Sequence, residues 1–218
     1  VLFSAGMFPI AFISGQENFY QHGYDLMEEK FEEMKWFLNR LLEGEQKMLF
    51  ETFYPDTWVD STYQIDFDEL YKKGYRGLIF DIDNTLVPHG EPADERAKAL
   101  FAHLKELGFS CCLLSNNQLE RVQMFNRDVQ VHYIEDAHKP SRKNYLKAME
   151  LMGTDLSDTV FIGDQLFTDV YGAKRTGMAN ILVKPIHPKE EIQIILKRYL
   201  EKICLLYTSD AADDSLRV

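Results

Sequence analysis

The sequence predicts an α/β fold, a doubly wound, Rossmann-like parallel five-stranded sheet with helices on both faces. Short runs that are apolar almost throughout alternate with longer stretches of helical periodicity. Gly108, Gly153 and Gly177 follow three of the helical stretches, at positions where a glycine commonly ends a helix. Strands that are apolar on both faces belong to parallel sheets covered by helices on either side, and this gives the predicted architecture.

The predicted strands and helices alternate along the chain from Tyr75 onward. We expect strands at residues 77–81, 110–115, 131–134, 159–163 and 180–183. We expect helices at residues 93–107, 118–127, 140–152, 166–176 and 188–202. Pro140 marks the start of the third helix, because proline is favoured at the first helical position.

The two ends of the chain differ from its middle, and we expect the folded domain to span residues 48–203. Residues 1–47 are an N-terminal extension of uncertain origin, with an amphipathic helix expected at about 25–42, and Met48 is a candidate start of the native protein. Residues 204–218 resemble the translation of a sequencing adapter and are expected to be a non-native tail, the alternative being a natural acidic tail.

Composition and charge exclude several classes of protein. The 218 residues are 45% hydrophobic and 13% aromatic, which is enough to form a core and excludes a disordered chain. The formal net charge of −11 argues against a nucleic-acid partner, because phosphate recognition needs an excess of Lys and Arg. Cys111 and Cys112 are adjacent on a predicted strand and so point to opposite faces. They do not suggest a disulfide, and we expect a reducing, cytoplasmic location.

Polar residues gather where the predicted strands end. In a doubly wound sheet the functional groups lie at the carboxyl ends of the strands, so we expect these side chains to meet. The candidate site residues are Asp81, Asp83, Ser115, Asn116, Lys139, Asp164 and Asp169.

The residue types indicate phosphoryl chemistry with a metal ion. Asp81, Asp83 and Asp164 offer oxygen ligands without a nearby Cys or His, which suits Mg²⁺ better than zinc. A carboxylate beside a metal can attack phosphorus and form an aspartyl-phosphate. Ser115 can donate a hydrogen bond to a phosphoryl oxygen, and Lys139 can neutralise its charge.

Each of these residues has an ordinary structural alternative. Ser115 and Asp164 could cap the helices that follow them, and Lys139 and Asp169 could be surface residues. Their shared position after successive strands favours a site over these separate explanations.

Four segments carry a resemblance to a known superfamily. The order DIDNTL (81–86), LLSNN (113–117), HKP (138–140) and GDQLFTD (163–169) resembles the four motifs of the haloacid dehalogenase (HAD) phosphatases. The resemblance implies an enzyme, a Mg²⁺-dependent phosphomonoesterase with Asp81 as nucleophile and Asp83 as general acid and base. It also implies phosphate binding by Ser115, Asn116 and Lys139, and metal binding by Asp81, the Asp83 backbone carbonyl, Asp164 and, in support, Asp169.

With FYPD (53–56) added, the pattern is similar to the YqeG family of subclass IIIA HAD phosphatases, whose relatives include phosphatidylglycerophosphate phosphatases. This resemblance implies phosphatidylglycerophosphate as substrate and a role in phospholipid metabolism. The intervals 86–114 and 116–138 each have room for one helix and one strand, so we expect a HAD core without a cap domain. An open site suits a phosphate carried on something large or anchored.

A weak peripheral contact with the inner face of a membrane is a further expectation. Phe50, Phe53, Tyr54 and Trp58 could lie at a bilayer interface or could pack as core. A local basic face at Lys139, Arg142 and Lys143 would help adsorption to anionic lipid.

Other functions remain as alternatives. A phospho-acceptor receiver domain is disfavoured because its acceptor aspartate follows the third strand, whereas the paired aspartates here follow the first. A HAD phosphatase for another large or soluble phosphorylated substrate, or a protein-binding HAD scaffold with weak catalysis, would carry the same motifs.

Overall fold

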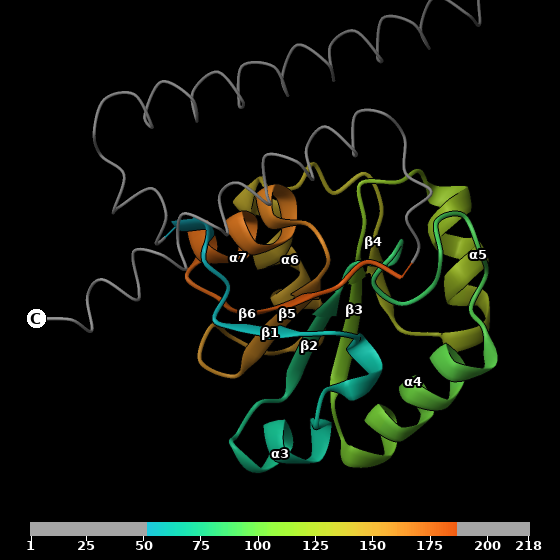
Figure 1. Ribbon diagram of the computed structural model, residues 1–218, viewed down its shortest axis with the longest axis horizontal. Coiled ribbons are helices and arrows are strands. Elements are labelled where there is room, and N and C mark those ends of the chain that lie inside the picture. The colour runs from blue at the N-terminus through green and yellow to red at the C-terminus, as the bar shows by residue number, and fades with distance from the viewer. Residues whose placement is uncertain (1–51, 187–218) are drawn as a thin grey trace, which may run out of the picture. The chain divides into compact units, whose positions relative to one another are not determined.

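The computed structural model describes residues 52–186, which form a parallel six-stranded sheet between two layers of helices (Figure 1). Four expectations lie outside the described residues: the extension 1–47 with its helix at 25–42, the helix at 188–202 and the tail 204–218.

The sheet is parallel throughout, with strand order β1-β6-β5-β2-β3-β4. From β2 the chain adds β3 and β4 on one side, then returns to place β5 and β6 on the other, as a doubly wound sheet does. The strands are β1 (Thr57–Val59), β2 (Gly77–Phe80), β3 (Ser110–Leu114), β4 (His132–Ile134), β5 (Thr159–Gly163) and β6 (Ala179–Val183).

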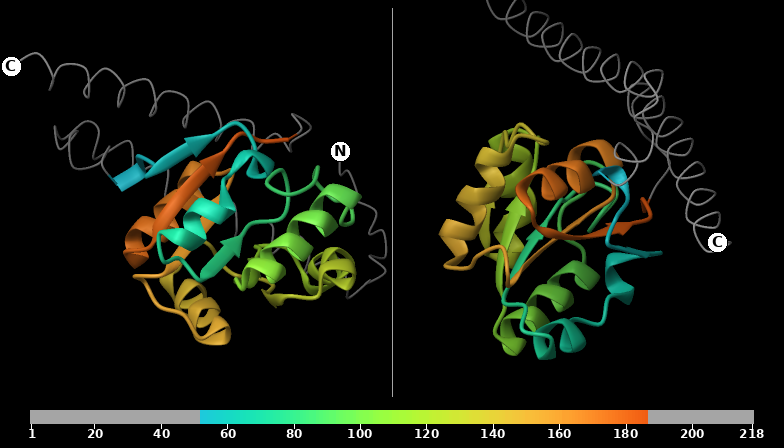
Figure 2. Two further views of the ribbon diagram at one scale, coloured as in Figure 1. Left: turned by 90° about the horizontal axis from the view of Figure 1, so that it is seen from below. Right: turned by 90° about the vertical axis from the view of Figure 1, so that its left-hand side faces the viewer.

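Helices cover both faces of the sheet, because side chains alternate along each strand. On one face, Leu78 and Phe80 pack with Phe101 and Phe125; on the other, Ile79 packs with residues of α6 and α7. The first layer thus holds α3, α4 and α5 and the second α6 and α7, as the right-hand view of Figure 2 shows. The α-helices are α3 (Phe67–Lys72), α4 (Glu95–Leu107), α5 (Leu119–Val129), α6 (Arg142–Met152) and α7 (Tyr171–Thr176).

The predicted fold class is confirmed, and the predicted number of strands is wrong. The sixth strand, β1, lies at the edge of the sheet and pairs with β6. Its three residues are too few to show a period, and its register depends on β6, more than 120 residues further along the chain. Helix α3 was likewise not predicted.

The predicted ends of the helices and strands agree with the observed ends to within a few residues. Gly108, Gly153 and Gly177 follow α4, α6 and α7 with positive φ angles, as expected for helix ends. Pro140 does not begin α6, which starts at Arg142. The predicted helix 166–176 consists of a π-helical turn (Leu166–Val170) followed by α7.

The two adjacent cysteines behave as predicted. Cys111 and Cys112 are free, buried thiols that pack into the cores on opposite faces of the sheet. Burial raises the pKa of each thiol to about 12, so neither has the character of a reactive thiolate.

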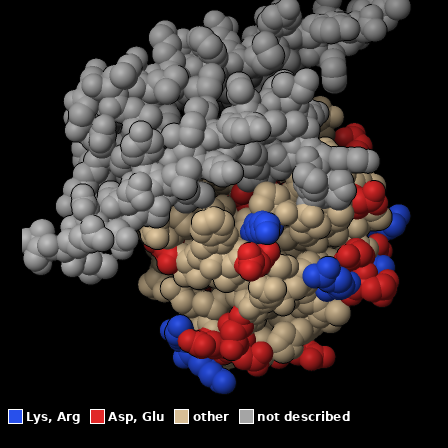
Figure 3. Space-filling model, in the orientation of Figure 1, with Lys and Arg blue, Asp and Glu red and all other residues tan. Residues whose placement is uncertain are grey.

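The surface of the described part carries mixed charge. On the face shown in Figure 3, acidic and basic side chains are interspersed and form no continuous basic stripe. Within residues 52–186, no helix is long and apolar enough to cross a membrane.

Candidate active site

The candidate site lies at the carboxyl ends of β2 and β5, neighbouring strands at the centre of the sheet. Asp81 directly follows β2 and Asp164 directly follows β5. The helix after β2, α4, covers one face of the sheet, and the helix after β5, α7, covers the other. The strand order therefore reverses at this point, where doubly wound proteins bind their ligands.

Three buried carboxylates and one lysine form the centre of the site. One oxygen from each of Asp81, Asp164 and Asp169 lies within 4.8 Å of the others. Lys139 Nζ donates to Asp81 Oδ1 at 2.6 Å and to Asp169 Oδ1 at 2.7 Å. The side chains of Lys139, Asp81 and Asp169 are 4%, 8% and 1% exposed, so these charges interact in a medium with little water.

Burial and neighbouring charges act in opposite directions on this cluster. Burial raises the pKa of Asp81 to about 7 against the attraction of Lys139, and the repulsion of Asp169 and Asp83 adds to the rise. Burial by itself would lower the pKa of Lys139, but the carboxylates of Asp169 and Asp81 outweigh it and hold this pKa above its ordinary value. Lys139 offsets the repulsion between Asp81 and Asp169, because its ammonium contacts both carboxylates.

The cluster has the composition that a magnesium ion needs. Its donors are carboxylate oxygens from Asp81, Asp164 and Asp169, with no His or Cys in the group. Hard oxygen ligands favour Mg²⁺ over zinc, and a dication would relieve the repulsion that raises the pKa of Asp81.

The backbone conformation around Asp169 directs its side chain into the site. It lies in the π-helical turn, and its Oδ2 accepts a hydrogen bond from the Gln165 backbone N–H at 3.0 Å. Gly163 makes room for it: a Cβ on this residue would lie 2.6 Å from Asp169 Cγ. Single π-turns inside helices are frequent at functional sites.

The segment after β2 is held from both sides. Thr85 Oγ1 donates to Asp164 Oδ1 at 3.2 Å, which ties this segment to the end of β5. Thr62 Oγ1 donates to the Thr85 carbonyl at 2.7 Å, and the Tyr63 hydroxyl donates to the Leu86 carbonyl at 2.5 Å. The short helical turn Thr62–Gln64, which lies before the four HAD-like motifs in sequence, therefore helps to fix the site.

The side chain of Asp83 has its own partners, separate from the three-carboxylate cluster. Its carboxylate accepts hydrogen bonds from Arg121, from Asn117 Nδ2 and from the Gly90 backbone N–H. Arg121 and Asn117 were missed in the sequence, although both fall within or directly before the first turn of α5. Charged residues in such turns are common, so position alone gave no signal of their partner.

Ser115 and Asn116 lie directly after β3, as predicted. Ser115 is fully buried, and its Oγ accepts hydrogen bonds from the backbone and side-chain N–H groups of Asn117. It does not cap α5, whose N-cap residue is Gln118. The Asn116 amide pairs with the backbone of Lys139 in both directions, at 3.2 and 2.7 Å, and so positions the lysine.

One surface expectation needs correction, and one pair of alternatives is decided. Lys139 is buried and paired with carboxylates, so it does not belong to an exposed basic face; only Arg142 and Lys143 of that group are exposed. Phe53 is buried against the rings of Phe167 and Tyr171 at 5.2 and 4.7 Å, so of its two predicted alternatives it packs as core.

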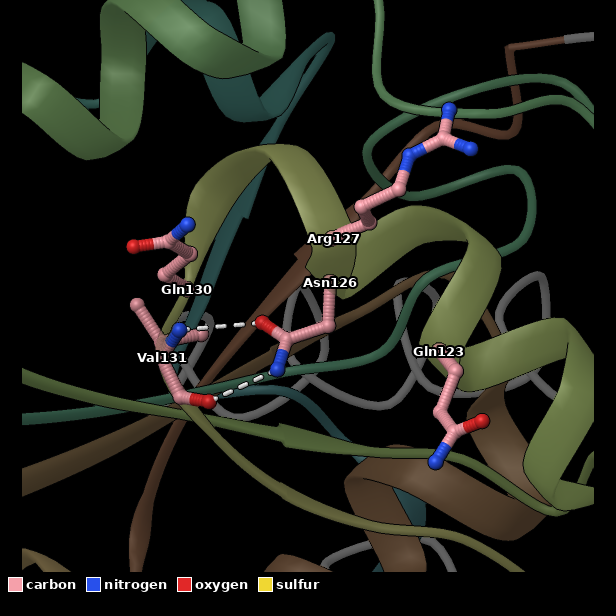
Figure 4. A pocket seen from close by; sticks show the side chains of 5 residues that line it. All are labelled: Gln123, Asn126, Arg127, Gln130 and Val131. Atoms are coloured by element: carbon pink, nitrogen blue, oxygen red, sulfur yellow. Dashed lines mark hydrogen bonds between the residues drawn. The ribbon is translucent and has the colours of Figure 1, made fainter.

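An open hollow of about 500 Å³ lies at the end of α5 (Figure 4). Its lining contains none of the predicted site residues. The Asn126 amide there donates to and accepts from the backbone of Val131, so it closes the end of the helix. This hollow is a surface feature separate from the carboxylate cluster.

Comparisons with known proteins agree with the predicted superfamily. The Hydrolase_like family, described as HAD-hydrolase-like, matches residues 137–191. The chain is 35% identical over 156 residues to the probable phosphatase YqeG of Bacillus subtilis, covering 71% of this chain and 91% of that protein.

Two other relatives are less similar. The chloroplastic/mitochondrial phosphatidylglycerophosphate phosphatase 1 of Arabidopsis thaliana is 26% identical over 168 residues, covering 68% of this chain and 48% of that protein. The glyceraldehyde 3-phosphate phosphatase of Pyrococcus abyssi is 28% identical over 97 residues, covering 40% of this chain and 41% of that protein. The chain thus spans about half the length, or less, of these two relatives.

Fold, motif order and relatives together define a HAD-type phosphatase, a phosphoric monoester hydrolase. Within that superfamily, the chain belongs to the YqeG family.

Proposed function

We propose that this phosphatase is Mg²⁺-dependent, that it acts through an aspartyl-phosphate on Asp81, and that its substrate is phosphatidylglycerophosphate. The observation that carries the chemistry is the buried cluster in which Lys139 contacts Asp81 and Asp169 while Asp164 lies within 4.8 Å of both. This cluster supports the proposal because the residues proposed as nucleophile, metal ligands and phosphate-binding cation lie together in it.

The proposed metal ligands are Asp81, the Asp83 backbone carbonyl and Asp164, with Asp169 in support. When bound, Mg²⁺ would balance the negative charge of the carboxylates and of the phosphoryl group, so that an anionic nucleophile can approach an anionic substrate.

The protein's own residues carry out both halves of the reaction. In the first half, an Asp81 oxygen bonds to phosphorus and the bond from phosphorus to the substrate oxygen breaks, while Asp83 gives its proton to that oxygen. In the second half, Asp83 takes a proton from water, the water oxygen bonds to phosphorus, and the bond to Asp81 breaks. The products are an alcohol and inorganic phosphate, and both aspartates return to their starting states.

Three further residues hold the transferring group. Ser115 donates from its hydroxyl and Asn116 from its backbone N–H, since the Asn116 side chain is committed to Lys139. Lys139 places its ammonium beside the attacking oxygen and neutralises charge that develops on the phosphoryl group.

The lipid substrate is supported by the open architecture and by one relative. Between β2 and β3 the chain holds α4, and between β3 and β4 it holds α5; neither interval contains an inserted domain. A phosphate anchored in a bilayer is held in place without a lid. Tyr54 and Trp58, which are 50% and 58% exposed, are available for a weak, peripheral contact with the cytoplasmic face of the membrane.

A phosphate-release assay with wild type and Asp81→Asn tests the mechanism. Asn keeps the shape of Asp81 but cannot attack phosphorus, so we expect activity to fall by at least about 10³-fold with the fold retained. EDTA should abolish wild-type activity and Mg²⁺ should restore it, whereas Ca²⁺, which prefers more ligands and longer distances, should restore little. Near-normal turnover by the variant, or by metal-free protein, would contradict the proposal.

A further inference from the structure

The carboxylate of Asp83 is surrounded by donors from two segments of the chain. Oδ1 accepts from the Gly90 backbone N–H at 2.8 Å and from Arg121 Nε and Nη2 at 3.2 and 2.8 Å. Oδ2 accepts from Asn117 Nδ2 at 2.6 Å. From this geometry we infer that Arg121 is a positioning residue for Asp83 in the hydrolysis proposed above, on which the inference rests.

The guanidinium of Arg121 is committed to Asp83. Two of its three nitrogens bond to the same carboxylate oxygen, and the two side chains are 13% and 11% exposed. The third nitrogen, Nη1, is buried and has no hydrogen-bond partner in the part of the chain that the structure describes. An arginine that tied segments together for stability would use its remaining donor, because a buried donor without an acceptor costs free energy.

The arrangement distinguishes the two oxygens of Asp83. With three donors, Oδ1 has no lone pair left for the substrate, whereas Oδ2 has one donor, the Asn117 amide. Oδ2 is therefore the atom that exchanges the proton with the leaving oxygen and then with water. The Asn117 amide also donates to Ser115 Oγ at 3.0 Å, so the acid and the phosphate-binding hydroxyl are connected.

One stretch of chain supplies the two side chains, Asn117 and Arg121, that donate to Asp83. Residues 115–121 run from the end of β3 into the first turn of α5. The backbone of α5 therefore fixes the point from which the Arg121 side chain extends. The stretch thus contributes both phosphate binding and orientation of the acid. A planar guanidinium that donates two hydrogen bonds fixes the orientation of a carboxylate better than an ammonium that donates one.

The consequence for the reaction depends on the leaving group. As the bond from phosphorus to an alkyl oxygen breaks, the Asp83 proton moves from Oδ2 to that oxygen, and a misdirected Oδ2 slows this transfer. A p-nitrophenolate group leaves without protonation, so the same misdirection has little effect on it. The ratio of kcat/KM for p-nitrophenyl phosphate to kcat/KM for glycerol 3-phosphate therefore reports how well Asp83 is oriented.

The test measures this ratio for the full chain with Mg²⁺. We expect Arg121→Met to lower kcat/KM for glycerol 3-phosphate by about 10- to 100-fold and for p-nitrophenyl phosphate by less than about threefold. Arg121→Lys, which can contact Oδ1 through one nitrogen, should restore part of the loss. Because both rates come from one sample, the ratio does not depend on the fraction of folded protein.

Two further variants make the result decisive. Arg127→Met, at an exposed arginine of the same helix, should leave the ratio unchanged. Asp83→Asn should show the same selectivity as Arg121→Met in stronger form. Equal losses on both substrates, or no loss, in Arg121→Met would overturn the inference. If Asp83→Asn itself shows no selectivity, the acid role of Asp83 is overturned instead.

Discussion

At the scale of single residues, the cluster of Asp81, Asp164, Asp169 and Lys139 holds ionisable groups in a buried environment that disfavours charge. Burial raises the pKa of Asp81 to about 7, although Lys139 lies 2.6 Å away. Loss of water around the buried carboxylate is the main cause, and repulsion from Asp169, which shares the same lysine, and from Asp83 adds to it. The site is therefore prepared for a further cation at the expense of the stability of the metal-free protein.

This cost predicts how the stability of the metal-free protein depends on pH. The pKa of Asp81 is raised on folding, so between about pH 4 and pH 7 the folded state binds the proton more tightly than the unfolded state, and stability falls as pH rises. Asp81→Asn removes the ionisation. We expect this variant to be more stable than wild type at pH 8 by on the order of 2–4 kcal/mol, and by less at pH 5.

Urea unfolding in EDTA at the two pH values measures the difference. The exposed aspartate Asp60 provides the control, and Asp60→Asn should change stability similarly at both pH values. An Asp81→Asn protein less stable than wild type at pH 8 would show that the ion pair with Lys139 outweighs burial.

At the scale of elements, the edge strand β1 depends on one aspartate. Asp56, directly before β1, accepts hydrogen bonds from the backbone and side-chain N–H groups of Asn180 at 3.1 and 2.7 Å. Its own backbone N–H donates to Asn180 Oδ1 at 3.2 Å, and Lys174 contacts the other carboxylate oxygen. The final residue of FYPD thus joins the start of β1 to β6.

Removing this side chain should loosen the edge of the sheet. We expect Asp56→Ala to lower the free energy of unfolding by about 1–2 kcal/mol, mainly through the lost hydrogen bonds, because the Lys174 ion pair is partly solvated. Amide exchange at residues 57–59 should become faster while exchange in β2 and β5 changes little.

Asp60→Ala, at the other end of β1, is the matched control and should alter stability by less than about 0.5 kcal/mol. An equally small change in stability for Asp56→Ala would contradict the prediction. It would mean that the backbone hydrogen bonds between β1 and β6 are enough to hold β1 in place.

At the scale of the whole molecule, no cap domain is inserted between the central strands of residues 52–186, because the intervals from β2 to β3 and from β3 to β4 each hold a single helix. Under the proposed function, anchorage of the lipid in a bilayer positions its phosphate without a lid. We expect phosphatidylglycerophosphate in vesicles to be hydrolysed with at least about tenfold higher kcat/KM than soluble glycerol 3-phosphate. Phosphate release at equal accessible phosphate concentration measures this.

The exposed aromatics allow a control for membrane contact. Trp58→Ser should lower kcat/KM for the lipid by about 3- to 10-fold without affecting the soluble ester. Leu151→Ser, at an exposed apolar residue of α6, should affect neither. Equal efficiency on lipid and soluble ester, or preference for a phosphopeptide or nucleotide, would favour a HAD phosphatase with a different substrate.

The sequence by itself determined the fold class, five strands, the described helices other than α3, and the order of the site residues. Apolar runs and helix-ending glycines are local signals, and the rule that function follows strand ends placed Asp81, Ser115 and Asp164 together before any contact was known. The adjacent cysteines were read correctly for the same reason, since alternation along a strand is a local property.

The tertiary structure alone decided which side chains meet. Strand β1 exists through pairing with β6, and Asp83 meets Arg121, 38 residues away. None of these contacts has a period or spacing that could reveal it. They form because the sheet brings segments that are far apart in the sequence close together in space. In this buried environment of low dielectric, hydrogen bonds stabilise particular pairs of side chains.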